Sequence, residues 1–429
     1  MRRARPKAFK PTAPPVELTV TAVGAQGDGV APRPGGGSPV HVPFGLPGER
    51  VSARVEGGRG EIVELLQASA DRVAPVSPHY GECGGCALQH WGHAPYLAWK
   101  AEQIRLALAR ERLETEIGPA FAAGPGTRRR LALHARPGRG GIARLGFKAR
   151  RSWDLVEVEV CPIADPRLVA AFPALRRLAA AFLEHPKSAP TLHVTLTETG
   201  IDVDVTGVER KSGGLSADAR LRAAQVAQDA EFARVTMSGE MVYGARQPMV
   251  RFGPAAVALP PGGFLQAVAA AEAAMADAAV EAARGARRIA DLFCGAGAFT
   301  FRLAEVAPVL AADAAEEAVS ALRAAVGTAP GLKTIAAEPR DLFRRPLSAA
   351  ELKGVDAVVF DPPRAGAAAQ VPEIAASRAG VVVGVSCNPA TFARDARVLV
   401  DGGFRLETVT PVDQFLWSPH IELVGVFRR

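Results

Sequence analysis

The rhythm of hydrophobic and polar residues changes along the chain and divides it into three predicted domains. Residues 16–69 consist of short alternating segments separated by glycine and proline clusters, which predicts a small β-barrel. Residues 70–255 have a less regular pattern and are expected to form a mixed central domain. From residue 256 to residue 429, helical segments alternate with short, fully apolar strands. This last pattern predicts a doubly wound, Rossmann-like α/β domain with a parallel sheet.

The central domain contains a basic, partly alternating stretch, residues 128–163. Its arginines are expected to form a phosphate-binding face, and Trp153 beside them offers a ring on which a base can stack. A strand face that is merely solvated would show the same pattern. The arginines concerned are Arg128, Arg129, Arg130, Arg139, Arg150 and Arg151.

Length and charge narrow the class of protein. A chain of 429 residues suits two or three domains, and a net charge of +7 favours a polyanionic partner such as RNA, although a GC-biased genome also enriches surface arginine. The basic, proline-rich residues 1–15 have no apolar core, which predicts a disordered tail and no secretory signal. No apolar run reaches the length of about 18 residues that a membrane span needs. We expect a cytoplasmic protein without membrane association and without an evident obligate protein partner.

A glycine turn predicts the cofactor site. In "IADLFCGAGAFTF" an apolar strand runs into a turn that opens a helix, and Gly295 and Gly297 let the backbone approach a ligand. The next strand ends at Asp313, whose carboxylate can accept hydrogen bonds from the ribose hydroxyls of a nucleoside cofactor. Alone, this pattern fits a nicotinamide dinucleotide, S-adenosylmethionine or only a tight turn.

A second motif, "VVFDPPRAG", indicates nucleic-acid methylation. Asp361 ends a buried strand, and the two prolines that follow force an extended turn that holds the carboxylate at the sheet edge. An acidic residue followed by two prolines at a strand end is typical of nucleic-acid methyltransferases. Arg364 stands where enzymes that methylate exocyclic amines usually have an aromatic residue, which favours chemistry at a ring carbon.

Cys387 follows a later strand, in "VVVGVSCNPATFARD", and should face the same pocket as Asp361. Carbon 5 of uracil is too poor a nucleophile to attack a methyl sulfonium, whereas addition of a thiolate to carbon 6 turns the ring into an enolate-like nucleophile. Cys387 is therefore a candidate covalent catalyst. The alternative is a buried structural cysteine at the end of a core strand.

Together these motifs resemble the uracil-C5 RNA methyltransferase family, which makes 5-methyluridine in transfer and ribosomal RNA. The resemblance spans a barrel like the TRAM domain, which has the oligonucleotide-binding fold, and the motifs "DLFCGAG", "DPPRAG", "SCNPATFARD" and "PHIELV". It implies S-adenosylmethionine as cofactor, Cys387 as nucleophile and Glu422 as the base that removes the carbon-5 proton. It also implies cofactor contacts from Gln266, Phe293, Asp313 and Asp361. Ala298 departs from the asparagine of many members, so one polar contact to the cofactor is expected to be lost.

The resemblance also implies a metal site. The ribosomal branch of the family holds a four-iron four-sulfur cluster through four cysteines, three of which correspond to Cys83, Cys86 and Cys161 here. Ser77 occupies the first ligand position. We expect a cluster whose fourth iron takes another ligand, such as Ser77 or His79, with zinc or no metal as alternatives.

The leading hypothesis is a methyltransferase that forms 5-methyluridine in structured RNA. The barrel and the cluster cysteines favour 23S ribosomal RNA over transfer RNA. The alternatives are a transfer-RNA uridine-C5 enzyme, a methyltransferase acting on another RNA base, and a non-catalytic protein that binds or folds RNA.

Overall fold

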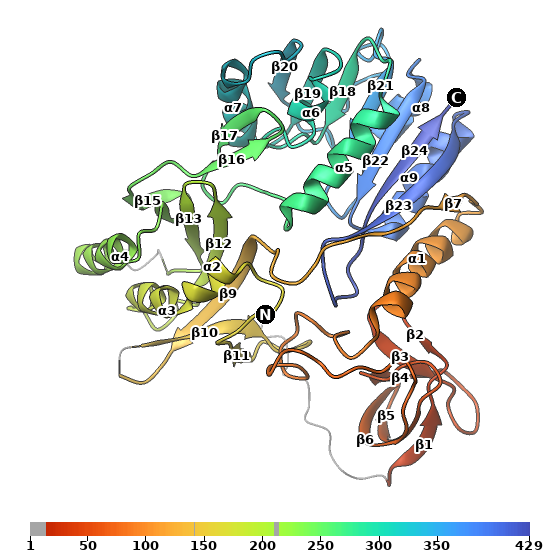
Figure 1. Ribbon diagram of the computed structural model, residues 1–429, viewed down its shortest axis with the longest axis vertical. Helices are drawn as coiled ribbons and strands as arrows, with labels where there is room; N and C mark the ends of the chain where they lie inside the picture. Colours follow the sequence, from red (N-terminus) through yellow and green to blue (C-terminus); the bar gives the residue numbers. More distant parts are fainter. Residues whose placement is uncertain (1–13, 141, 210–213) are drawn as a thin grey trace. The chain divides into compact units, whose positions relative to one another are not determined.

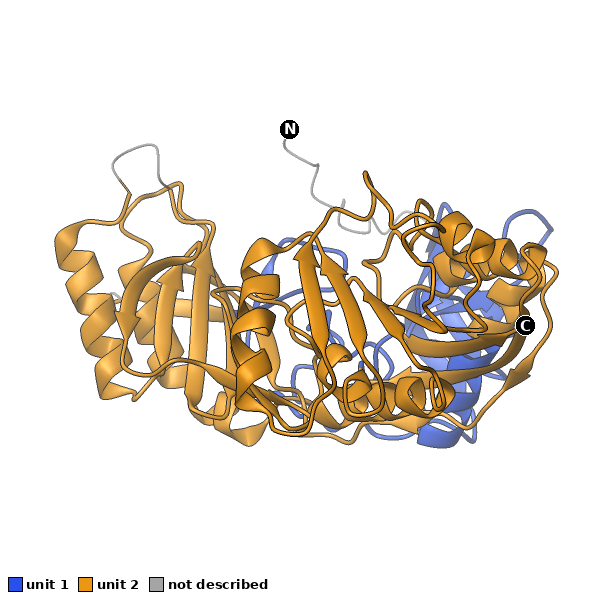
Figure 2. Cartoon of the chain, turned by 90° about the horizontal axis from the view of Figure 1, so that it is seen from above, with its two compact units in different colours: residues 1–103, 146–162, 415–419 blue, residues 104–145, 163–414, 420–429 orange. Residues whose placement is uncertain are grey.

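The computed structural model describes residues 14–140, 142–209 and 214–429 (Figure 1). Residues 1–13 of the predicted tail lie outside the described residues. The chain divides into two compact units, each built from several stretches of sequence (Figure 2). Unit 1 contains residues 1–103, 146–162 and 415–419, and unit 2 contains residues 104–145, 163–414 and 420–429. The three predicted domain boundaries stay a prediction.

Unit 1 begins with a curled sheet in which the strand order is β1-β5-β6-β4-β3-β2. Because side chains alternate between the two faces of a strand, one face of this sheet is buried. Its buried cluster includes Leu18, Val40, Val42, Val51 and Ala53. This sheet fits the predicted small barrel. Its strands are β1 (Val16–Thr19), β2 (Ala22–Val23), β3 (Asp28–Ala31), β4 (Val40–Pro43), β5 (Arg50–Glu56) and β6 (Arg59–Gln67).

The remainder of unit 1 is held to this sheet by buried polar contacts. The first turns of α1 (His93–Arg110) place Trp99, whose Nε1 donates a hydrogen bond to the carbonyl of Val23 at 2.8 Å. Arg150 and Arg151 lie between the last residues of β10 (Ala143–Lys148) and β11 (Leu155–Glu157), and both pair with buried Asp28, at 2.7 and 2.5 Å. Two of the arginines predicted to bind phosphate therefore have an intramolecular partner.

Unit 2 contains a mixed sheet whose central strands run in the order β9-β12-β13-β14-β15. Helix α3 packs against β9, α4 packs against β14 and β15, and the two helices pack against each other. The strands are β9 (Arg130–Pro137), β12 (Thr191–Thr197), β13 (Gly200–Thr206), β14 (Arg234–Met237) and β15 (Glu240–Gly244), and the helices are α2 (Pro166–Ala170), α3 (Phe172–Ala181) and α4 (Ala217–Asp229). A two-stranded ribbon, β16 (Met249–Phe252) and β17 (Ala255–Ala258), follows.

The larger sheet of unit 2 has the order β20-β19-β18-β21-β22-β24-β23-β7 (Figure 1). The strands from β20 to β22 are parallel, β24 is antiparallel to β22, and helices connect the strands, which confirms the predicted doubly wound α/β fold. The strands are β7 (Glu116–Ile117), β8 (Phe121–Ala122), β18 (Ile289–Leu292), β19 (Val309–Asp313), β20 (Ile335–Pro339), β21 (Ala357–Phe360), β22 (Val381–Ser386), β23 (Arg405–Asp413) and β24 (Glu422–Arg428). The helices are α5 (Ala269–Ala282), α6 (Thr300–Leu303), α7 (Glu316–Ala325), α8 (Val371–Ala376) and α9 (Pro389–Asp401).

Two glycines make room for the helix that follows Cys387. Gly384 of β22 and Gly425 of β24 are paired on neighbouring antiparallel strands, and the ring of Phe392 from α9 lies over them. A Cβ atom at Gly425 would lie 2.3 Å from the Phe392 ring, and one at Gly384 would lie 2.9 Å from Phe360. Any larger residue would push α9 away from the sheet. The glycine pair thus determines how closely the start of α9 approaches the strand ends.

Candidate active site

The predicted cofactor and catalytic residues gather at the carboxyl edge of the larger sheet. The parallel register places Leu292 beside both Ala312 and Phe360, and Phe360 beside Gly384. The residues that follow these strand ends therefore share one edge, where ligands of doubly wound sheets bind.

The glycine turn that the sequence predicts after β18 contains three residues in the left-handed region. Phe293, Gly295 and Gly297 all have positive φ angles, of 61°, 54° and 100°. A Cβ atom at Gly297 would lie 2.7 Å from the Phe301 ring, so the close approach of turn and helix requires glycine there. Phe293 adopts a left-handed conformation that is costly for a residue with a side chain, and such strain is concentrated at functional sites.

Asp313 closes this turn. One carboxylate oxygen accepts a hydrogen bond from the Gly295 backbone N–H at 2.9 Å, and the other accepts one from Ala315 at 2.7 Å. The carboxylate thus ties the glycine turn to the end of β19. The turn faces the edge at which a nucleoside would lie.

Four buried or nearly buried side chains form a continuous hydrogen-bonded chain across the edge. Gln266 donates from Nε2 to Oδ2 of Asp361 at 3.1 Å. Gln414 donates from Nε2 to Oε1 of Gln266 at 2.7 Å and to Oε2 of Glu422 at 2.8 Å. The two predicted carboxylates, at the ends of different strands, are therefore linked through two amides.

Burial perturbs the acids of this chain. Loss of water raises the pKa of Asp361, and the nearby carboxyls of Glu272 and Asp313 raise it further, while the Gln266 hydrogen bond opposes the shift. Burial is also the main cause of the raised pKa of Glu422, followed by the charge of Asp361, and the Gln414 hydrogen bond opposes it. Both groups therefore hold a proton to higher pH than ordinary carboxyls.

Cys387 lies between the end of β22 and the start of α9 and is partly buried. Asn388 caps α9 by accepting from the Ala390 N–H at 3.1 Å, and its Nδ2 donates to the carbonyl of Arg364 at 3.1 Å. These bonds tie the cysteine loop to the "DPPR" turn. Burial, and then the carboxyls of Glu422 and Asp361, raise the pKa of the Cys387 thiol to about 11. The thiol is therefore protonated at neutral pH.

Two residues of the site were missed by sequence reasoning. Gln414 stands in "PVDQFLW", which carries no motif that would single out a glutamine. Asp291 is fully buried in β18, accepts a hydrogen bond from Thr300 at 2.5 Å, and has a pKa raised to about 7, mainly by burial. The sequence feature that could have identified Asp291 is an acidic residue inside an otherwise apolar strand.

The arginines at the start of β9 support the Gln266 segment. Arg129 donates to the carbonyl of Gln266 at 3.1 Å and pairs with Glu272 at 2.7 Å, and Arg130 donates to the carbonyl of Leu265 at 2.9 Å. Sequence reasoning placed both on a phosphate-binding face. The contacts give them a structural role in holding the loop that carries Gln266.

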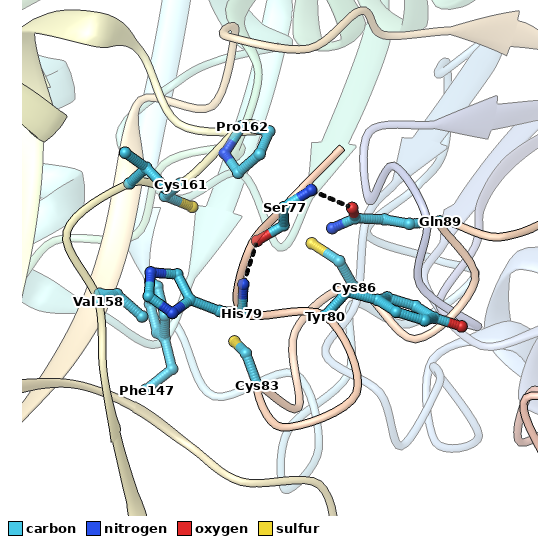
Figure 3. A pocket seen from close by; sticks show the side chains of 11 residues that line it. Ser77, His79, Tyr80, Cys83, Cys86, Gln89, Phe147, Val158, Cys161 and Pro162 are labelled. Atoms are coloured by element: carbon cyan, nitrogen blue, oxygen red, sulfur yellow. Dashed lines mark hydrogen bonds between the residues drawn. The ribbon is translucent and has the colours of Figure 1, made fainter. Parts of the chain in front are cut away.

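In unit 1, the three predicted metal ligands line one cavity together with Ser77 and His79 (Figure 3). The side chains of Cys83, Cys86 and Cys161 point toward a common space. Ser77 is fixed from both sides, because its N–H donates to Gln89 at 3.0 Å and its hydroxyl oxygen accepts from the His79 N–H at 3.2 Å. The sequence positions that the resemblance selected therefore converge in space.

Among the described residues, no three His, Cys, Asp or Glu side chains lie close enough to hold one metal ion. A zinc ion would need its ligands within about 2.3 Å of one centre. The thiols of an iron–sulfur cluster bind different iron atoms and are spaced more widely. The donor set, with three cysteines and one hydroxyl, fits such a cluster in its chemistry.

Within the described ranges, no helix combines the length and the apolar character needed to cross a membrane.

Comparison with known proteins identifies similar chains over nearly the full length. The sequence model of the tRNA (Uracil-5-)-methyltransferase family matches residues 257–429. An uncharacterized RNA methyltransferase of Caulobacter vibrioides is 67% identical over 96% of this chain and 100% of its own. The 23S rRNA (uracil(1939)-C(5))-methyltransferase RlmD of Alkalilimnicola ehrlichii is 33% identical over 97% of each chain.

A solved structure shares the fold. The tRNA (uracil-54, C5)-methyltransferase of Pyrococcus abyssi, in complex with S-adenosyl-L-homocysteine, is 23% identical and matches with a TM-score of 0.71. The match covers 96% of this chain and 99% of that chain.

The buried carboxyls predict how stability depends on pH. A carboxyl whose pKa is raised in the folded state stabilises the fold most below its unfolded pKa of about 4, and this contribution is lost as the pH rises through the folded pKa. Asp291, Asp361 and Glu422 all shift in this direction. The melting temperature of the ligand-free protein should therefore fall between about pH 5 and pH 8.

Glu422→Gln should flatten this fall by about 2 °C or more, because the amide stays neutral throughout. Thermal unfolding followed by circular dichroism across this range measures the effect. Glu351→Gln is the control, since Glu351 is exposed and its pKa is lowered to about 2 by Arg340. Parallel melting curves for the wild type and Glu422→Gln would contradict a buried, neutral Glu422.

Proposed function

The chain belongs to the uracil-C5 RNA methyltransferase family, and on that basis we propose that it forms 5-methyluridine in 23S ribosomal RNA through a covalent bond between Cys387 and carbon 6 of the uracil. As a member, it is an enzyme that uses S-adenosylmethionine. The observation that carries the finer proposal is the meeting of one thiol and two buried carboxyls at a single sheet edge.

The cofactor-binding role falls to the residues around the glycine turn. Gly295 and Gly297 allow the backbone to approach the ligand, while Phe293 follows the end of β18 with its ring 5.5 Å from that of Phe343. Asp313 is assigned to the ribose. Gln266 and Asp361 face the same edge, so that their amide and carboxylate complete the site.

Cys387 would add to carbon 6 as a thiolate. Burial, and then the charges of two nearby carboxyls, raise the pKa of the thiol, so its proton is held tightly. Arg364, on the "DPPR" turn, opposes this effect, since its charge lowers the pKa of the thiol. When bound, S-adenosylmethionine supplies the methyl group and a positive sulfur, and positive charge near Asp361 would favour the thiolate.

Glu422 would act on the second half of the reaction. After methyl transfer, carbon 5 carries both a methyl group and a hydrogen, and the bond to the Cys387 sulfur breaks only when a base removes that hydrogen. The electron pair of the carbon–hydrogen bond then re-forms the ring double bond and expels the thiolate. Burial raises the pKa of Glu422 and so makes its carboxylate a stronger base.

Glu422→Gln should therefore permit adduct formation and methyl transfer but prevent release. With RNA and cofactor, this variant is expected to give a slower band on a denaturing gel, in which RNA remains attached to the protein. Cys387→Ala is the control, because it should bind cofactor normally but give neither the band nor methylated RNA. Normal release of methylated RNA by Glu422→Gln would assign proton removal to another base.

Ribosomal RNA is favoured over transfer RNA by one observation: the relative that is 33% identical over 97% of the chain is named as a 23S rRNA methyltransferase. The barrel does not separate the two substrates, because the match to the transfer-RNA enzyme covers 96% of this chain. The matched family model and the solved neighbour carry transfer-RNA names, so transfer RNA is the competing substrate.

Nucleoside mass spectrometry of separated RNAs from a deletion strain distinguishes the two substrates. We expect a loss of 5-methyluridine from 23S rRNA and none from transfer RNA. Complementation with the wild-type gene should restore the nucleoside, and complementation with Cys387→Ala should not. A loss confined to transfer RNA would overturn the choice of substrate, and no loss in either RNA would overturn the proposed activity.

We further propose that Cys83, Cys86 and Cys161 hold an iron–sulfur cluster, with Ser77 or His79 at the fourth iron. The convergence of these side chains on one cavity supports it. An oxygen or nitrogen ligand in place of a fourth thiolate would leave the cluster more labile.

Protein purified without oxygen should therefore be brown and contain both iron and sulfide. Elemental analysis should show a loss of iron in Cys83→Ser, together with a lower melting temperature. Cys387→Ala, which changes a cysteine outside the cavity, should keep its iron. Anaerobic wild-type protein without iron would exclude the cluster.

A further inference from the structure

We propose that Gln414 is a positioning residue for methyl transfer: its amide fixes the orientation of Gln266 and holds Glu422 in the form that accepts the carbon-5 proton. This inference rests on the proposed function, since it takes Glu422 as the base. Gln414 lies just after β23, and Glu422 begins β24, so the two residues stand at the two ends of the loop that joins these strands.

The donors and acceptors determine the direction of the hydrogen-bonded series of side chains. The backbone N–H of Ala267 donates to Oε1 of Gln414 at 2.9 Å, so this oxygen is the acceptor end of the side chain. Both hydrogens of Gln414 Nε2 are then used, one on Gln266 Oε1 and one on Glu422 Oε2. Because Gln266 accepts through its oxygen, its Nε2 must face Asp361.

Because these side chains are buried, the loss of one of their hydrogen bonds would be costly. Gln414 is 2% exposed, Glu422 is 3% exposed and Gln266 is 5% exposed, so water has little access to replace a lost partner. An unsatisfied buried donor or acceptor costs more than a typical hydrogen bond contributes. A Gln266 amide without Gln414 would be free to turn its oxygen toward Asp361, which would place two acceptors face to face.

Gln414 donates a hydrogen bond to Glu422, and the ionisable groups nearby determine how strongly this bond affects the Glu422 carboxyl. Ionisable groups after neighbouring strands are Asp361 after β21 and Cys387 after β22, with Asp413 at the end of β23 and Arg364 on the turn after Asp361. Helix α5, which packs against β24, adds buried Glu272, and Arg129 pairs with it. Asp361 opposes a second negative charge on Glu422, and the Gln414 N–H favours it. Removal of this N–H would keep Glu422 protonated to higher pH.

Gln414→Met tests the role, because methionine has a similar volume and no donor or acceptor of comparable strength. Total RNA from a deletion strain, labelled with tritium at carbon 5 of uridine, serves as substrate. The adduct is formed at about pH 6 and moved to a series of higher pH values, and the tritium released then reports removal of the carbon-5 proton. We expect the profile of Gln414→Met to lie about one pH unit above that of the wild type, so that release is about tenfold slower at neutral pH and recovers at alkaline pH.

Gln370→Met is the matched control. Gln370 is also a fully buried glutamine that makes two hydrogen bonds, but both go to the backbone of Leu347. It should lose thermal stability and keep the wild-type pH profile. Gln414→Glu is a second variant in case Gln414→Met does not fold, and its added negative charge should displace the profile at least as far in the same direction.

The outcomes separate the two proposals. A wild-type enzyme that releases no tritium would overturn the proposed function itself. The second outcome applies when the wild type releases tritium. If the pH profiles of Gln414→Met and Gln414→Glu then have the wild-type shape, either unchanged or reduced by a constant factor, Gln414 is only structural and the inference fails.

Discussion

The withdrawal of carboxyl groups from water is the constraint on which the site depends. Asp291 and Glu422 are buried and Asp361 is half-buried at one sheet edge, where amides and a hydroxyl donate the hydrogen bonds that water would otherwise supply. Hydrogen bonds from neutral donors offset only part of such a cost. The pKa values of these carboxyls are therefore raised, and the positive charge of the proposed cofactor would favour their ionised forms.

The smaller central sheet supports this edge through backbone as well as side-chain contacts. The N–H of Arg129 donates to the carbonyl of Ala267 at 2.9 Å, and Arg128 forms a bridge with Val268. The segment with Gln266 is thus fixed from one side by the start of β9 and from the other by Gln414. A shift at β9 would change the direction of the Gln266 amide. The central sheet therefore helps to determine the position of the Gln266 segment.

Much of the fold and of the site was predictable, because period and strand-end motifs are local properties of the sequence. Alternating helices and apolar strands predicted the larger sheet, and strand-end positions placed Asp313, Asp361 and Cys387 at one edge. Gln414 was not predictable, because its importance lies in partners distant in sequence, as the bond to Gln266 shows. The intramolecular contacts of Arg129 and Arg130 were not predictable for the same reason: charge is visible in a sequence, whereas an intramolecular partner is not.

The paired glycines beneath Phe392 bear on how an RNA is chosen. Because that ring rests against Gly384 and Gly425, α9 is packed tightly onto the sheet, and the Cys387 thiol just before it has little freedom to reach outward. In the proposed mechanism, the nucleotide would then have to close the distance between sulfur and carbon 6 by leaving its stack. A uridine in a weakly stacked loop would make this movement at lower cost than one inside a helix. With that mechanism, rigidity of the protein at this point would select for RNA that deforms easily.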